Sequence, residues 1–271
     1  MRIAWLPDLM CSMPQKSNGG NETGRGGMRV IVLSLFPGIG MLDMAFEEEG
    51  FCIVRGPDLL WGGDIRKFHP PEGKFDGIIG GPPCQCFSRL RHIVKHNGYQ
   101  LAPNMIPEFE RCVFEAQPLW FLMENVLDAP KPQVAKYFVS DSIVEDVTVG
   151  GETSRKRRFS FGSIRYIRLE IDQLALWKYP EPCVTASGGY REQPIKIGGS
   201  GKQKKSRTHL SNKGWIGKRD WKEALRLQGL PDDFDLPSFT MREKYRAIGN
   251  GVPIAMGRAV AKAVKKVLEM K

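Results

Sequence analysis

Apolar runs alternate with amphipathic segments over residues 29 to 168. The apolar runs include RVIVLSLF, FCIVRG, FDGIIGG and LWFLMENV, each long enough for one strand. The segments MLDMAFEEEG and EFERCVFEAQ lie between such runs and have helical periodicity. Strands that are apolar on both faces and alternate with helices are typical of a parallel sheet covered by helices on both sides. The sequence therefore predicts an α/β fold with a mostly parallel sheet.

Four regions follow one another along the chain. Residues 1–28 are rich in Gly, Asn and Ser, so we expect a flexible extension there. Residues 29–180 contain the α/β pattern, whereas residues 181–240 lose it and predict a small loop-rich, basic region. Residues 241–271 end in a helix that packs back on the α/β domain. Three lysines of this helix are expected to point outward: Lys262, Lys265 and Lys266.

The surplus of basic residues limits the partners. A formal net charge of +10 and an isoelectric point near 9.4 favour a polyanion, most simply nucleic acid, although an anionic membrane surface also fits. No apolar run approaches the ~20 residues that cross a bilayer. The six cysteines are scattered, with only Cys84 and Cys86 close together, so we expect neither disulfides nor structural zinc. We expect a cytoplasmic monomer without metal.

A glycine-rich turn, FPGIG at residues 36–40, connects the first predicted strand to a helix. Gly38 and Gly40 would let the backbone approach a ligand at the helix N-terminus. Asp43 stands where a dinucleotide fingerprint has its third glycine, so a pyrophosphate is a less suitable ligand than a cofactor held through an adenosine. An ordinary strand-to-helix turn is the alternative.

Two acidic residues follow the second predicted strand. Asp58 could accept bonds from the hydroxyls of a ribose, and Asp64 with Ile65 could meet an adenine amino group and ring face. Each carboxylate could instead be a solvated loop charge. The segment between Asp58 and Phe75 is also short for a full helix and strand.

The stretch GGPPCQCF places a cysteine on a proline-stiffened turn after a buried strand. Together with FPGIG, ENV at 124–126, TSRKRRF at 153–159 and GNGVP at 249–253, its PPCQ resembles the ordered motif set of the DNA cytosine-C5 methyltransferase family. The resemblance covers roughly residues 29–265. It implies a Rossmann-like fold, S-adenosylmethionine as cofactor, and double-stranded DNA as partner. The compact size fits a restriction-modification enzyme of phage or mobile-element type in a bacterial or phage-infected cell.

The resemblance also implies catalytic roles. Cys84 would add to C6 of a flipped cytosine, Glu124 would supply a proton at N3, and Arg157 would reach O2. A thiolate is the effective nucleophile, and we expect nearby positive charge to lower the pKa of Cys84. Thr153 stands where the family usually has glutamine, and Met41 stands where it usually has a glycine.

Binding residues are implied by the same match. The cofactor would contact Phe36, Gly38, Ile39, Gly40, Asp58, Asp64, Ile65, Pro83, Asn250 and Val252. Nucleic acid would contact Gln85, Ser88, Arg89, Arg91, Arg155, Lys204, Lys205 and Arg207. Arg155 is also expected to support Arg157, and target recognition is expected within residues 186–217.

Two alternatives stay open. The same chemistry could act on tRNA cytosine, because the tRNA-directed members of the family share PPCQ and ENV. CFS at residues 86–88 only partly matches the Cys-Phe-Thr element of those members, which favours DNA. A catalytically weakened DNA-binding protein is the other alternative, against which Cys84, Glu124 and Arg157 argue.

Overall fold

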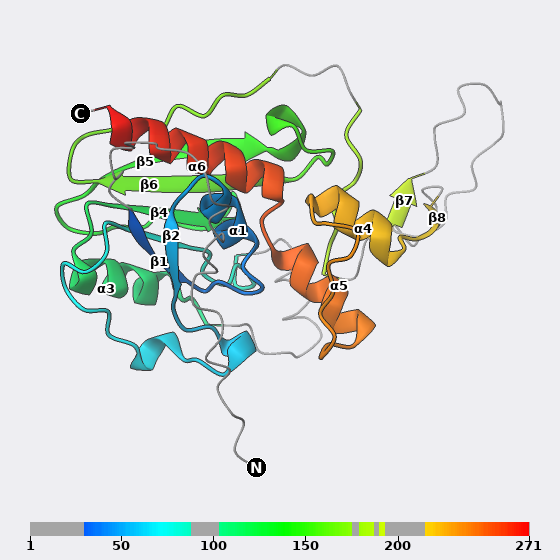
Figure 1. Cartoon of the computed structure of the whole chain (residues 1–271), viewed down its shortest axis with the longest axis horizontal. Helices are drawn as coiled ribbons and strands as arrows, with labels where there is room; N and C mark the ends of the chain where they lie inside the picture. Colours follow the sequence, from blue (N-terminus) through cyan, green and yellow to red (C-terminus); the bar gives the residue numbers. More distant parts are fainter. Residues whose placement is uncertain (1–29, 88–102, 175–178, 187–189, 193–214, 271) are drawn as a thin grey trace, which may run out of the picture.

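The computed structural model describes residues 30–87, 103–174, 179–186, 190–192 and 215–270. Its centre is a six-stranded sheet with the spatial order β2-β1-β3-β4-β6-β5 (Figure 1). The strands are β1 (Ile31–Leu35), β2 (Cys52–Arg55), β3 (Gly77–Gly80), β4 (Trp120–Asn125), β5 (Phe138–Glu145) and β6 (Lys156–Ser163). The first four in spatial order are parallel, and β6 runs antiparallel to both β4 and β5. The predicted α/β class is confirmed, with an antiparallel pair at one edge.

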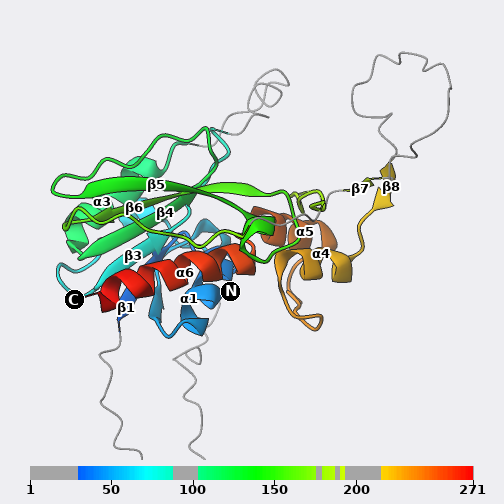
Figure 2. The same ribbon diagram turned by 90° about the horizontal axis from the view of Figure 1, so that it is seen from above.

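Helices cover both faces of this sheet (Figure 2). The helices α1 (Met41–Glu48) and α6 (Ile254–Glu269) pack on one face, and α3 (Ile106–Ala116) packs on the other. Successive strand residues point to opposite faces, so Val32 joins the core under α6 while Leu33 joins the core under α3. The near-continuous apolar runs of the sequence are explained by this burial on both sides.

Large rings of β4 lie over glycines of the neighbouring strands. Trp120 pairs with Gly77 of β3, and Phe121 pairs with Gly162 of β6. A Cβ added to Gly77 would lie 2.2 Å from the Trp120 ring, and one added to Gly162 would lie 2.1 Å from the Phe121 ring. Both rings are fully buried, so the absent side chains of these glycines provide the space that the rings fill.

The connection from β2 to β3 contains two short 3-10 turns, η1 (Leu59–Trp61) and η2 (Ile65–Lys67), and no α-helix. Each turn begins at a carboxylate predicted to bind the cofactor. Asp58 accepts a hydrogen bond from the Leu60 amide at 2.7 Å, and Asp64 accepts one from the Arg66 amide at 3.0 Å. The shortness of this segment in the sequence is matched by these compact turns.

The C-terminal part holds α4 (Trp221–Gln228), α5 (Met241–Asn250), and a two-stranded sheet of β7 (Tyr190–Glu192) and β8 (Trp215–Lys218). The helices α4 and α5 share one core with Met41 of α1 and Ile254 of α6. The region predicted for residues 181–240 therefore includes a helix that packs with the closing segment. Residues 1–28 and most of residues 186–217 lie outside the described residues, and the domain limits stay a prediction.

The last helix has the orientation predicted from its periodicity. Met256, Val260 and Val264 are buried against the sheet. Lys262, Lys265 and Lys266 are exposed, as expected. None of the helices in the described part of the chain is long and apolar enough to span a bilayer.

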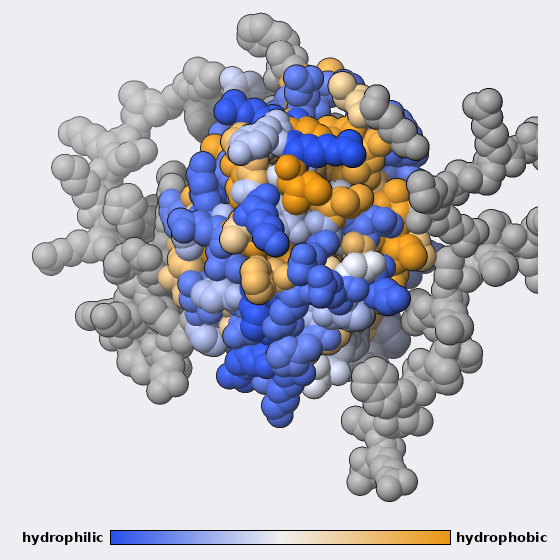
Figure 3. Space-filling view, turned by 90° about the vertical axis from the view of Figure 1, so that its left-hand side faces the viewer, coloured by the Kyte–Doolittle hydropathy of each residue, from blue (hydrophilic) through white to orange (hydrophobic). Residues whose placement is uncertain are grey.

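Figure 3 shows the face at the left of Figure 1, where apolar side chains reach the surface in patches separated by polar ones. At the amino end of β4 there is a cavity of about 160 Å³. Its lining includes Leu119, which precedes β4, and Ile164, which follows β6. Glu124, the predicted catalytic acid, lies at the opposite end of β4, so this cavity is separate from the predicted active site.

Candidate active site

The predicted functional residues gather at the carboxyl edge of the parallel strands. Gly38 follows β1, Asp58 follows β2, Cys84 follows β3, and Glu124 lies near the end of β4. Because β2, β1, β3 and β4 are parallel neighbours, their carboxyl ends meet at one edge. Ligands of open α/β sheets bind at this edge.

The turn after β1 has the backbone that its glycines favour. Gly38 has φ +57° and Gly40 has φ +82°, and Phe36 also has a positive φ of 56°. The Gly38 amide donates to Asp58 Oδ2 at 2.8 Å, and the Trp61 indole nitrogen donates to the Gly38 carbonyl at 2.6 Å. No atom lies within 4 Å of a Cβ built on Gly38, so there is open space beside the turn. The structure thus joins the glycine turn directly to the predicted ribose acceptor.

Asp43 supports this turn from below, a role that the sequence analysis missed. Its carboxylate is 1% exposed and accepts bonds from Ser34 Oγ at 2.5 Å and Arg55 Nε at 2.9 Å. Burial raises the pKa of Asp43, while the bonds from Ser34 and Arg55 act in the opposite direction. The first turn of α1 is therefore tied to β1 and β2.

Asp64 and Ile65, the residues predicted to contact the adenine, lie in different environments. Asp64 accepts bonds from the Arg66 side chain as well as its amide, and this partner lowers the pKa of Asp64 to about 2. Ile65 is 3% exposed and packs in the core under α3. Its side chain therefore has almost no free surface for the predicted contact with an adenine ring. We correct the expected adenine contact of this side chain, because the side chain is buried in the core.

The closing segment reaches the cofactor turn. A Cβ added to Gly251 would lie 2.3 Å from Sδ of Met41, the first residue of α1. Asn250 is exposed beside it, and Val252 is buried. The predicted residues Asn250 and Val252 are thus brought next to the turn.

Glu124 and Arg157 form an ion pair at the predicted catalytic position. Arg157 Nε lies 2.8 Å from Glu124 Oε1, and the two side chains are 17% and 11% exposed. Glu124 is paired in register with Phe159, so Arg157 is its diagonal neighbour on the same face of β6. The side-chain Nδ2 of Asn125 donates to the Pro82 carbonyl at 3.1 Å, and this bond holds the PPC turn against the end of β4.

Cys84 is half-buried on the turn after β3. Burial raises the pKa of its thiol, and the Glu124 carboxylate raises it further, while Arg157 and Arg155 act in the opposite direction. The expected cations are present and act as predicted. The prediction of a lowered pKa is nevertheless wrong for this structure, because burial and the carboxylate outweigh the arginines.

Arg155 lies beneath the site. It is 4% exposed and donates from Nη1 to the Val184 carbonyl at 3.0 Å, and burial lowers the pKa of its guanidinium to about 10. The expected contact between Arg155 and DNA is corrected, because burial leaves its side chain no surface. Its position fits the expected supporting role beside Arg157.

Thr153, which stands where the family usually has glutamine, bonds within the chain. It is fully buried, and its hydroxyl and amide donate to Asp146 Oδ2 at 2.7 and 3.0 Å. This pair closes the turn before β6, so the substituted position has a defined structural role.

Further predicted residues differ in how far the structure places them. Pro83 is half-buried and Gln85 is exposed in the Cys84 turn. Six of the predicted DNA contacts lie outside the described residues: Ser88, Arg89, Arg91, Lys204, Lys205 and Arg207. In the described part of the chain, no group of three His, Cys, Asp or Glu side chains could hold a metal ion.

The Cys84 thiol, the Glu124 carboxyl group and the Arg157 guanidinium lie at the carboxyl edge of a Rossmann-like sheet, where enzymes of this fold class bind their ligands. Comparison with known families identifies the class of enzyme. The model of the C-5 cytosine-specific DNA methylase family matches residues 61–138 and 127–266, more than half of the chain. The chain therefore belongs to this family, and it is a DNA cytosine-5-methyltransferase.

Curated relatives and solved structures agree with this membership. The type II methyltransferases M.NgoPII of Neisseria gonorrhoeae and M.FnuDI of Fusobacterium nucleatum are each 25% identical to it over 335 aligned positions. These alignments cover 88% of this chain and 96% and 94% of the relatives. Because the aligned positions outnumber the 271 residues here, these relatives carry segments that this chain lacks.

The fold is shared with the Entamoeba histolytica methyltransferase EhMeth, with a TM-score of 0.58 and 14% identity over 89% of this chain and 99% of the other. It is also shared with a mutant of Spodoptera frugiperda DNMT2, with a TM-score of 0.57 and 16% identity over 89% of this chain and all of the other.

Proposed function

We propose that this enzyme transfers a methyl group from S-adenosylmethionine to C5 of a cytosine that is flipped out of double-stranded DNA, through a covalent bond between Cys84 and C6. The observation that carries the proposal is the meeting of the Cys84 turn with the Glu124–Arg157 ion pair of 2.8 Å at the carboxyl edge. Family membership supports the same reaction. Two of the relatives come from bacteria, which supports the bacterial cell that we propose as the setting of this reaction.

The residues of the glycine turn fit the adenosine part of this cofactor. Open space lies beside Gly38, and the Asp58 carboxylate keeps acceptor positions beyond the two amides that it already bonds. Those positions suit the two hydroxyls of a ribose. We assign the remaining contacts to Phe36, Ile39, Gly40, Asp64, the main chain of Ile65, Pro83, Asn250 and Val252. The cofactor supplies the methyl group when it is bound.

Cys84 starts the reaction. Its Sγ forms a bond to C6, and the electrons displaced into the ring are neutralised by a proton that Glu124 delivers at N3. As Sγ bonds to C6, the thiol proton passes to the Glu124 carboxylate, and Glu124 delivers this proton to N3, so the step balances without an external acid. After C5 takes the methyl group, a solvent water molecule removes the C5 proton, the bond from Sγ to C6 breaks, and the N3 proton returns through Glu124 to the thiolate.

Glu124 and Arg157 must change partners during this sequence. In the structure without substrate, the carboxylate accepts a bond from Arg157 Nε. When cytosine is bound, protonated Glu124 would donate a hydrogen bond to N3 of the cytosine, and Arg157 would donate one to O2. These two bonds would replace the ion pair. Burial raises the pKa of Cys84 and so favours the protonated thiol while the site holds no cytosine.

DNA contact is proposed for the segments on either side of this edge. Gln85 is exposed next to Cys84. Three residues that we predict to contact DNA follow it in the sequence: Ser88, Arg89 and Arg91. The predicted Lys204, Lys205 and Arg207 belong to the basic region, which we propose as the target-recognition region.

The reaction is tested by incubating the protein and a Cys84→Ser variant with tritiated cofactor and unmethylated DNA or tRNA, followed by bisulfite sequencing. We expect label in DNA, none in tRNA, and none with the variant, because a hydroxyl is far less nucleophilic than a thiolate. DNA containing 5-fluorocytosine should trap a covalent adduct whose peptide contains Cys84.

Each alternative gives its own result in this experiment. Label in tRNA but not in DNA would favour the RNA substrate, and DNA binding without any label would favour a weakened DNA-binding protein. Substantial turnover by the variant, or an adduct on Cys86, would contradict the role of Cys84.

The role of the basic region is tested by replacing Lys204, Lys205 and Arg207 together with glutamine. If they contact phosphates, the salt dependence of DNA binding should flatten by about one unit of slope per lost contact. The matched control replaces the three exposed lysines of α6, which removes the same charge: Lys262, Lys265 and Lys266. An equal change in both variants would show that net charge alone matters.

A further inference from the structure

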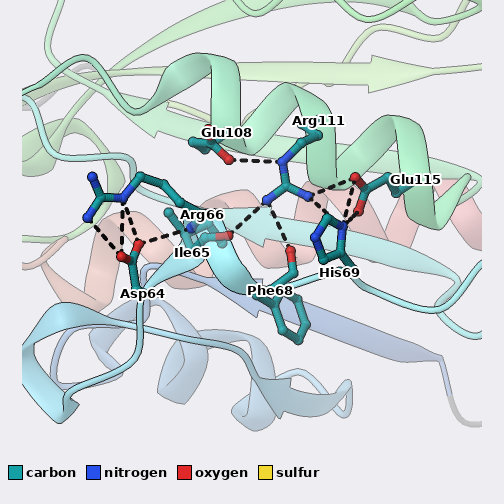
Figure 4. Close-up of polar contacts among 8 residues, drawn as sticks. All are labelled: Asp64, Ile65, Arg66, Phe68, His69, Glu108, Arg111 and Glu115. Carbon is teal, nitrogen blue, oxygen red and sulfur yellow. Dashed lines mark hydrogen bonds and ion pairs between the residues drawn. The ribbon is translucent and has the colours of Figure 1, made fainter.

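Arg111 on α3 connects this helix to the loop that carries Asp64 and Ile65 (Figure 4). The close-up shows its guanidinium between two acidic side chains of its own helix, with the carbonyls of Ile65 and Phe68 facing it from the loop. Arg111 was not among the residues that the sequence motifs identified. Its contacts join a helix outside the motif set to a proposed cofactor loop.

All three nitrogens of the guanidinium are used. Nη2 donates to the Ile65 carbonyl at 2.8 Å and to the Phe68 carbonyl at 3.0 Å. Nε lies 2.9 Å from Glu108 Oε2, and Nη1 lies 2.8 Å from Glu115 Oε1. A planar fork is needed to reach two loop carbonyls and two carboxylates at once, which an ammonium group cannot do.

The two carboxylates keep this fork charged and in place. Burial works against the charge of Arg111, but its bonds to Glu115 and Glu108 raise its pKa above the ordinary value. Burial also opposes the charge of Glu115, yet the bond from Arg111 holds the pKa of that carboxyl below its usual range. His69 adds a contact to Glu115 at 3.1 Å from the exposed side of the loop.

The loop has few other bonds that fix it. It belongs to no strand. The 3-10 turn contributes the bonds from the Lys67 amide to the Asp64 carbonyl at 3.0 Å, from the Phe68 amide to the Ile65 carbonyl at 3.1 Å, and from the Arg66 amide to Asp64 Oδ1 at 3.0 Å. Arg66, which pairs with Asp64, is 60% exposed. The bonds from Arg111 are therefore the polar link, among the described residues, between the backbone of this turn and α3.

We propose that Arg111 is a positioning residue for cofactor binding, which holds the segment 64–68 so that Asp64 and the main chain of Ile65 face the adenine. The inference rests on the proposed function. Arg111 touches no reacting group, so its loss should weaken cofactor binding and leave the rate of the chemical step almost unchanged.

The test measures binding of S-adenosylhomocysteine by calorimetry to the full-length protein and to Arg111→Lys and Arg111→Gln. Each variant should bind about tenfold more weakly or worse, which corresponds to one lost charge-assisted hydrogen bond. At saturating cofactor, kcat should stay within about twofold of wild type, so that the effect falls on KM. Glu115→Gln keeps the bonds to the carbonyls and should have the smaller effect.

Arg258→Lys is the matched control, because Arg258 pairs with Glu48 at 2.6 Å on the surface of α6, away from this loop. It should bind S-adenosylhomocysteine as wild type does. Amide hydrogen exchange adds a second measurement for a variant of low stability: in Arg111→Lys the segment 64–68 should exchange faster while α3 stays protected.

If wild type binds S-adenosylhomocysteine and both Arg111 variants bind it equally well, the inference about Arg111 is overturned while the proposed function stands. Unchanged exchange of residues 64–68 in Arg111→Lys would overturn it as well. A wild-type protein that binds no S-adenosylhomocysteine would instead refute the proposed function. A drop in kcat as large as the rise in KM would assign Arg111 a general structural role and also reject the inference.

Discussion

The Glu124–Arg157 ion pair allows a quantitative prediction about stability. We replace Glu124 with glutamine, Arg157 with glutamine, and then both. Glutamine keeps the length of the glutamate side chain and can still accept a bond from Arg157, but it carries no charge. Each single variant therefore leaves one charge in a site where the two side chains are 11% and 17% exposed.

The magnitude follows from the separation and the burial of the pair. Two unit charges separated by the observed 2.8 Å attract each other by about 6 kcal/mol at an effective dielectric constant of ~20. Desolvation offsets much of this attraction, and removing one partner of a buried pair typically costs about 3–5 kcal/mol. Because glutamine at position 124 retains a hydrogen bond of about 1 kcal/mol, we expect a loss of about 2–4 kcal/mol for Glu124→Gln.

The double variant separates the pair energy from local damage. With both charges removed, the two amides can bond each other, and the loss should be smaller than the sum of the single losses by at least about 1.5 kcal/mol. Urea unfolding at pH 7, followed by tryptophan fluorescence, gives the three free energies, provided that the m-value stays constant. Additive losses within about 0.5 kcal/mol would refute the coupling inferred from the short distance.

Three further predictions concern the thiol, the core and the cofactor turn. The alkylation rate of Cys84, measured by mass spectrometry of its peptide, should keep rising as the pH passes the ordinary thiol pKa near ~8.5, and Glu124→Gln should move this profile to lower pH; a wild-type midpoint below ~8 would contradict the burial argument. Gly162→Ala should cost about 3 kcal/mol in urea unfolding through overpacking, more than Gly150→Ala, where φ is +93° and no atom is near; equal losses would show that the ring can move aside. Because burial raises the folded pKa of Asp43 above 3.8, wild type should lose stability relative to Asp43→Asn as the pH rises from 3.8 through that higher pKa, which urea midpoints at pH 4 and 7 compare; an unchanged difference would contradict the raised pKa.

Much of the fold could be predicted because burial on both faces leaves a simple sequence pattern. Continuous apolar runs indicated the parallel strands, and their ends located Cys84 and Glu124. The antiparallel pair of β6 with β4 could not be predicted, since it depends on where the chain returns after residue 145 and not on local composition. The same limit applies to the strand order, which is set by long-range packing.

The errors at Ile65 and Arg155 have a common cause: the sequence alone does not say which residues face the core. The run RKRR looks uniformly basic, yet Arg155, the residue before β6, is buried while Lys156 is exposed. Asp43 was noted only for the glycine that it replaces, and its buried bonds to Ser34 and Arg55 leave no signal in a single sequence.

The rings that lie over glycines also determine the position of Glu124, the proposed catalytic acid. Trp120 fits only opposite Gly77, and Phe121 fits only opposite Gly162, so β4 is locked in register with the strands on both of its sides. A slip by one residue would place Trp120 against Ile78 and turn every side chain of β4 to the other face. Glu124 would then lose its contacts with Gly81 and Arg157, although the rings that prevent the slip lie three and four residues before it in β4.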